Sequence, residues 1–166
     1  MQENSFMKKA ILFLVIGAVV IIVDQIVKWS FVDGYRAELG CISFILTYNT
    51  GVAFSMCSDL GEWLKYIQIA LIVGMIGYFL YEKVFIDEHF IALAFILGGG
   101  ISNVADRFMH IGVVDFFYWH CGFDFAVFNL ADVSINFGVF LIALGFLRAF
   151  IKTKKASWKI SFLWVH

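Results

Sequence analysis

Four long apolar stretches, separated by shorter and more polar segments, dominate the pattern of this chain. They cover approximately residues 10–31, 63–81, 90–108 and 130–150. Each is close to the roughly 20 residues that an α-helix needs to cross the hydrocarbon core of a bilayer. The pattern therefore predicts an all-α polytopic membrane protein with four transmembrane helices, organised as a single membrane-embedded domain over residues 1–166.

The two long connections, about residues 32–62 and 109–129, contain apolar runs of their own. Residues 41–49 in the first are rich in β-branched and aromatic side chains, which indicates one or two short strands near the membrane surface. Residues 113–119 in the second are apolar and aromatic and favour a loop in the interfacial aromatic belt. We thus expect a small β-containing region outside the bilayer.

The composition agrees with lipid as the surrounding solvent, since 62% of the residues are hydrophobic and only 15% are charged. The net charge of -1 indicates no class of partner, but the placement of the cations predicts an orientation, because positive residues favour the cytoplasmic side. Most flank the ends of the spans away from the long connections: Lys8, Lys9, Lys83, Arg148, Lys152, Lys154, Lys155 and Lys159. Both termini are therefore expected in the cytoplasm.

Lys8 and Lys9 followed by an apolar run are also compatible with a cleavable signal peptide. However, no small-x-small cleavage pattern follows, and the apolar run continues to Phe31. A retained first helix is the better interpretation.

The three cysteines, Cys41, Cys57 and Cys121, fall in or beside the two outer connections. One disulfide is possible there, but the odd count and the absence of C-x-x-C spacing leave free thiols equally open.

Charged residues inside the spans are costly and are therefore candidates for function. Asp24 and Lys28 share one face of the first helix at i and i+4, where they can neutralise each other. A structural ion pair and a role in substrate contact both stay open for them.

The third span ends in Gly98-Gly99-Gly100 and then in Asn103, Asp106 and Arg107, which together indicate a polar, closely packed helix end.

Two aspartates lie at the outer membrane face on the arms of one loop. Asp115 has apolar neighbours, which favour its protonated form. Asp132 follows Asn129 at the start of the fourth span in a capping-box pattern, where a helix N-terminus favours the ionised form. Antiparallel helices can bring them together as a proton-sharing pair, one activating water and the other protonating a leaving group. Alternatively, Asp132 is only a capping residue.

Four ordered segments carry a family resemblance. They are D-x-x-x-K at Asp24 and Lys28, N-x-G-x-A-F-S at residues 49–55, a glycine-rich stretch leading through N-x-x-D-R to G-V-V-D-F at residues 98–116, and F-N-x-A-D at residues 128–132. In this order and over most of the chain, they resemble the signature segments of the lipoprotein signal peptidases, also called signal peptidase II.

The resemblance implies an intramembrane aspartyl endopeptidase of the bacterial cytoplasmic membrane, with its active site on the extracytoplasmic face. Its substrate would be a prolipoprotein with diacylglycerol on a cysteine, cut just before that cysteine. Asp115 and Asp132 match the catalytic aspartates. The matches to substrate-binding or supporting positions are Asp24, Lys28, Asn49, Gly51, Asn103, Arg107, Asn129 and Ala131. No cofactor, metal or nucleic acid is expected, the partners being substrate and membrane lipid, and we expect a monomer.

Other functions fit parts of the pattern less well. Residues 100–103 fit the G-x-S-x of a rhomboid-like serine protease, but no histidine lies in the fourth span, and a zinc peptidase would need H-E-x-x-H. A transporter usually places its acids near the midplane, on paired repeats that this chain lacks. In a non-catalytic scaffold the two aspartates would only cap helices and bind headgroups.

Overall fold

A computed structural model describes residues 2–51 and 56–163. Its helices are α1 (Gln2–Val32), the 3-10 turn η2 (Ser58–Leu60), α2 (Trp63–Tyr81), α3 (Lys83–Met109) and α4 (Leu130–Leu163), and its strands are β1 (Ala37–Leu39), β2 (Ile42–Asn49) and β3 (Val113–Trp119). Four of the helices are long and apolar enough to cross a membrane, over Phe6–Val32, Trp63–Tyr81, Glu88–Met109 and Leu130–Lys154. The four predicted helices are therefore present.

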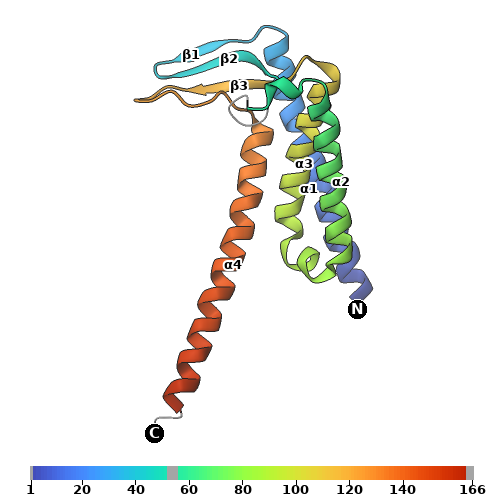
Figure 1. The fold of residues 1–166 in the computed structure, drawn as a ribbon, viewed down its shortest axis with the longest axis vertical. Helices are drawn as coiled ribbons and strands as arrows, with labels where there is room; N and C mark the ends of the chain where they lie inside the picture. Colours follow the sequence, from blue (N-terminus) through green and yellow to red (C-terminus); the bar gives the residue numbers. More distant parts are fainter. Residues whose placement is uncertain (1, 52–55, 164–166) are drawn as a thin grey trace.

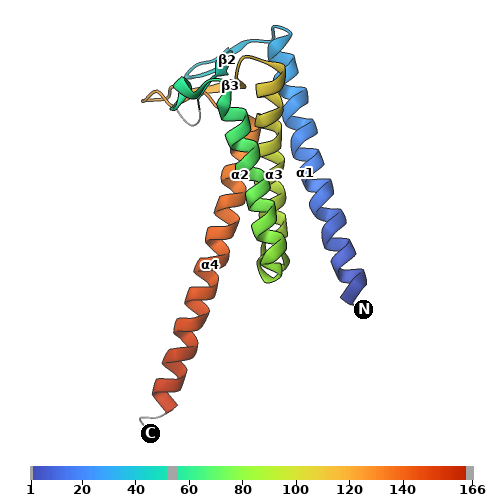
Figure 2. The same cartoon turned by 45° about the vertical axis from the view of Figure 1, so that its right-hand side comes forward.

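Helix α3 is the central element of the bundle. In its most apolar window 44% of the residues are buried, against 6%, 11% and 11% for the windows of α1, α2 and α4. It packs against all three of these helices, and α4 diverges from the others towards its C-terminal end (Figures 1 and 2). The residues that carry a site held between helices should therefore be sought on α3.

The three strands form one antiparallel sheet in the order β1-β2-β3. Figure 1 shows this sheet across the end of the helices that is opposite to both termini. Phe116 of β3 stacks on Phe31 of α1, with ring centroids 4.5 Å apart, which fastens the sheet to the bundle. The β2–β3 register shifts between Phe44 and Thr47, so the ladder is interrupted directly beside Asp115, the partner of Thr47.

Three local expectations need refinement. The strands expected within residues 41–49 are confirmed, but residues 113–119, interpreted as an interfacial loop, form β3. The third helix, expected over about residues 90–108, already begins at Lys83, so the connection between α2 and α3 is the single residue Glu82. Finally, Cys41 and Cys121 form a disulfide, while Cys57 is free and exposed.

Candidate active site

Asp115 and Asp132 are placed by two different elements that meet at the sheet end of the bundle. Asp115 lies on β3, and Asp132 lies in the first turn of α4. The backbone N–H of Asp132 donates to Asn129 Oδ1 at 2.8 Å, and the N–H of Asn129 donates to Asp132 Oδ2 at 3.3 Å. The capping box expected from the sequence is therefore present, and it fixes one aspartate at a helix N-terminus.

Two asparagines connect the two carboxyl groups. Asn129 Nδ2 donates to Asp115 Oδ1 at 2.7 Å, and Asn103 Nδ2 donates to Asp132 Oδ1 at 2.8 Å. Asn129 Nδ2 also lies 3.1 Å from Asn103 Oδ1, which closes the chain of hydrogen bonds. Both aspartates thus belong to one network, in which Asp115 is buried and Asp132 is half-buried.

Asp115 is the more enclosed of the two, with only 2% of its surface exposed. Burial raises the pKa of its carboxyl group from 3.8 to about 7, and the neighbouring charge of Asp132 acts in the same direction. Hydrogen bonds from Asn49 and Asn129 oppose the increase without cancelling it. Asp115 therefore holds a proton near neutral pH, as its apolar neighbours in the sequence predict.

A buried triad of charged residues, Asp24, Lys28 and Asp106, lies next to the network of the two aspartates. Lys28 Nζ is 2.6 Å from Asp24 Oδ2 and 2.7 Å from Asp106 Oδ2, and all three side chains are at most 2% exposed. The expected ion pair at i and i+4 is thus present, together with a second acid from α3. Lys28 also donates to Asn103 Oδ1 at 2.9 Å, which links the triad to the network of the aspartates.

The two acids of the triad hold the backbone beside each candidate catalytic residue. Asp24 Oδ1 accepts the N–H of Ala131 at 2.8 Å, and Asp106 Oδ2 accepts the N–H of Val114 at 3.0 Å. Each of these N–H groups belongs to the residue directly before Asp132 or Asp115. Since hydrogen bonds to ionised groups are stronger than neutral ones, the triad positions the backbone next to both aspartates.

Arg107 ties a third segment to the site. It donates to Gln68 Oε1 of α2 at 2.9 Å and to the backbone carbonyl of Gly51. The N–H of Gly51 in turn donates to Asn49 Oδ1 at 3.0 Å, which shapes the turn after β2. The rest of the N-x-G-x-A-F-S segment, residues 52–55, lies outside the described residues.

Asp106 was singled out in the sequence only as part of the polar helix end and of the N-x-x-D-R segment. Three further polar residues join the site although the sequence did not nominate them for it. Gln25 donates to Asp106 Oδ1 at 2.8 Å and to Ser102 Oγ at 3.0 Å, and Ser102 donates to Asp24 Oδ2 at 2.7 Å. The third is Gln68, the partner of Arg107. Polarity inside an apolar span was the available signal. Ser102 is fully buried, and its hydroxyl donates to the carboxylate of Asp24 rather than to the histidine that a serine protease needs.

This chain is similar to known proteins in sequence and in fold. A family model described as Signal peptidase (SPase) II matches residues 16–148. Proteins named lipoprotein signal peptidase from Sulfurimonas denitrificans and Wolinella succinogenes are 50% and 43% identical, over 92% and 86% of this chain and 98% and 97% of their own lengths. A solved bacterial membrane enzyme, 26% identical, superposes with a TM-score of 0.72 over 82% of this chain and 88% of its own.

Proposed function

This chain belongs to the signal peptidase II family and removes the signal peptide from prolipoproteins, and we propose that Asp115 and Asp132 are the two groups that hydrolyse the peptide bond. The observation that carries the proposal is the hydrogen-bonded connection from Asp115 through Asn129 and Asn103 to Asp132. It supports a shared proton, which an aspartyl peptidase requires.

The reaction follows from the difference between the two carboxyl groups. Asp132, at a helix N-terminus, takes a proton from the water that attacks the scissile carbonyl carbon. Asp115, whose pKa burial raises to about 7, donates its proton to the carbonyl oxygen. The tetrahedral intermediate then collapses, its oxygen returns a proton to Asp115, and the departing amine takes the proton that Asp132 received. Both aspartates end in their starting states.

The substrate we propose is a prolipoprotein with diacylglycerol on the cysteine that follows the scissile bond. Two acyl chains would hold that bond at the depth of the membrane interface. This proposal is supported by the position of the two aspartates on β3 and in the first turn of α4, elements that meet at the end of the spanning helices covered by the sheet (Figure 1). Lipid-anchored peptide and water can meet at this level.

The site faces the extracytoplasmic side of the bacterial cytoplasmic membrane in this proposal. Two independent features support that orientation. Cations gather at the opposite ends of the helices, where positive residues favour the cytoplasm. The disulfide Cys41–Cys121 lies in the sheet region, and disulfides form and persist in oxidising compartments outside the bacterial cytoplasm.

The remaining nominated residues have supporting roles. Asp24 and Lys28 hold the backbone and the asparagines, and Arg107 holds the turn at Gly51. The activity we propose is that of a monomer, since one chain supplies both aspartates and the two asparagines that connect them. One membrane-embedded domain is then sufficient for the reaction.

A cleavage assay with purified enzyme in detergent tests the proposal. We expect it to cut a diacylglyceryl-modified lipobox peptide just before the modified cysteine, and Asp115→Asn or Asp132→Asn to abolish cutting in protein that still folds. Asp124→Asn is the matched control, because Asp124 is exposed in the same loop and the amide oxygen of an asparagine can still accept the hydrogen bond from Tyr118. Full activity of either dyad variant would refute the assignment.

A further inference from the structure

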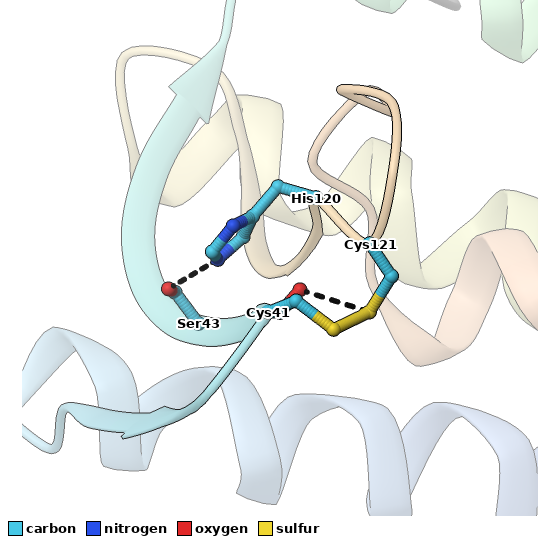
Figure 3. The surroundings of a disulfide bond; sticks show 4 residues. All are labelled: Cys41, Ser43, His120 and Cys121. Atoms are coloured by element: carbon cyan, nitrogen blue, oxygen red, sulfur yellow. Dashed lines mark hydrogen bonds between the residues drawn. A yellow bond between two sulfur atoms is a disulfide. The ribbon is translucent and has the colours of Figure 1, made fainter.

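The disulfide between Cys41 and Cys121 lies beside the Ile42–Trp119 pair of the β2–β3 ladder, whereas Asp115 pairs with Thr47 further along it. Figure 3 shows the disulfide with its neighbours Ser43 and His120. Cys41 occupies the turn between β1 and β2, Cys121 follows β3, and their Cα atoms are 4.8 Å apart. The N–H of His120 donates to the Cys41 carbonyl at 2.9 Å, and its side-chain Nε2 lies 3.0 Å from Ser43 Oγ. The start of β2 is thus held to the end of β3 by one covalent bond and two hydrogen bonds.

Beyond the disulfide, the chain returns along β3 towards the active site. Phe125 donates its N–H to the Trp119 carbonyl at 2.9 Å, and Phe128 exchanges backbone hydrogen bonds with Phe117 at 2.9 and 3.0 Å. The hydroxyl of Tyr118 closes the loop by donating to Asp124 at 2.8 Å. We call residues 113–128, which are β3 and this return segment, the β3 tongue.

The two arms of the β3 tongue carry the two halves of the catalytic pair. Asp115 lies on the outgoing arm, and the returning arm leads directly into Asn129 and the first turn of α4, which holds Asp132. A shift of one arm relative to the other would therefore change the separation of the carboxyl groups. The β2–β3 ladder is interrupted between Phe44 and Thr47, directly beside Asp115, so regular strand pairing alone does not fix this part of β3 on β2.

We propose that the Cys41–Cys121 disulfide is a positioning element for catalysis, which fixes the β3 tongue on β2 so that Asp115 and Asp132 keep their productive spacing. The inference rests on the proposed function. Formation of the bond removes two electrons and two protons from two thiols and reduces a disulfide of an extracytoplasmic oxidant, a protein or a small molecule, to its dithiol. Full activity of the enzyme then depends on an earlier thiol-oxidation reaction outside the cytoplasm.

Kinetics of the full-length enzyme in detergent test the proposal. We expect Cys41→Ser/Cys121→Ser to lower kcat on the lipobox peptide by about tenfold or more, since misplacement of reacting groups by a fraction of an ångström to 1 Å costs up to about 100-fold. KM should change little, and the alkaline limb of the pH–rate profile should move, because the spacing of the carboxyl groups sets their interaction. A thiol reductant should reproduce these changes in the unmodified enzyme and leave the double variant unaffected.

The controls separate positioning from mere stabilisation. Cys57→Ser, which removes the free and exposed thiol, should behave like the unmodified enzyme. An unchanged kcat and pH profile in the double variant, or a loss confined to Tm or KM, would overturn the proposal. Three alkylatable thiols in denatured, unreduced protein instead of one would also overturn it. If the unmodified enzyme does not cleave the peptide at all, the proposed function fails, and the thiol count still tests the bond.

Discussion

At the scale of single residues, the protonation of Asp115 links structure to measurable activity. Burial raises the pKa of this carboxyl to about 7, so the acid form is present below that pH and is lost as the pH rises through it. We therefore expect kcat/KM on the lipobox peptide to fall about tenfold for each pH unit above about 7. Initial rates between pH 5 and 9, with Tm measured at each pH as a control for unfolding, check this. A rate that stays constant to pH 9 would show that Asp115 is not the acid.

Residues whose partners are near in sequence could be predicted, and those with remote partners could not. Asp24 and Lys28 pair at i and i+4, and Asn129 and Asp132 form a capping box, so local spacing was sufficient. Asp106 completes the triad only because α1 and α3 pack together. The same packing forms the neighbouring bond between Ser102 and Asp24, which are 78 residues apart in sequence. Periodicity carries no information on that contact. The four family segments named the main site residues, but not the geometry that joins them.

At the scale of elements, the junction of α3 with α4 depends on Gly99. A Cβ atom added there would lie 2.5 Å from the carbonyl oxygen of Ala131, and this backbone leads directly into Asp132. Gly100, the next residue on α3, has room, since a Cβ atom there would meet Ile72 Cδ1 at an ordinary 3.5 Å. Adjacent glycines on one helix therefore offer a matched pair of tests.

We expect Gly99→Ala to push the first turn of α4 away from α3 and to lower kcat by about tenfold to 100-fold, because catalytic groups tolerate little misplacement. Overpacking should also cost about 1–3 kcal/mol of stability. Gly100→Ala should keep near-normal activity and gain up to about 1 kcal/mol from helix propensity. Steady-state kinetics and thermal unfolding of both variants measure these effects. Equal activity of the two would mean that the close contact at Gly99 does not position Asp132.

Elements differed in how well the sequence predicted them. Apolar length located all four spanning helices, but it could not show that α1 begins at Gln2 or that α4 continues to Leu163, because helices extend past the lipid into polar residues. The strand β3 was interpreted as a loop, since its aromatic residues also suit a membrane interface. Its strand conformation depends on pairing with β2 across two intervening helices, which no local pattern reports.

At the scale of the whole molecule, an even number of spans places both ends of the chain on one side and the sheet on the other. The architecture alone does not distinguish the two orientations, but the cations and the disulfide favour the same one. In that orientation the half-buried Asp132 lies on the extracytoplasmic side. This is the side on which we propose that the signal peptide is separated from the mature lipoprotein. Sidedness is therefore a requirement of the reaction and can be tested without measuring catalysis.

Cys57 provides a natural reporter of this sidedness, because it is free, exposed and located between β2 and α2 at the sheet end. In intact spheroplasts we expect a membrane-impermeant maleimide to label Cys57 while the disulfide keeps the other two cysteines unreactive. A single reporter at the opposite end, Thr153→Cys in the Cys57→Ser background, should be labelled only after the membrane is permeabilised, since Thr153 is exposed near the end of α4 that we propose to be cytoplasmic. The reverse pattern of labelling would place the two aspartates on the cytoplasmic side and contradict the proposed function.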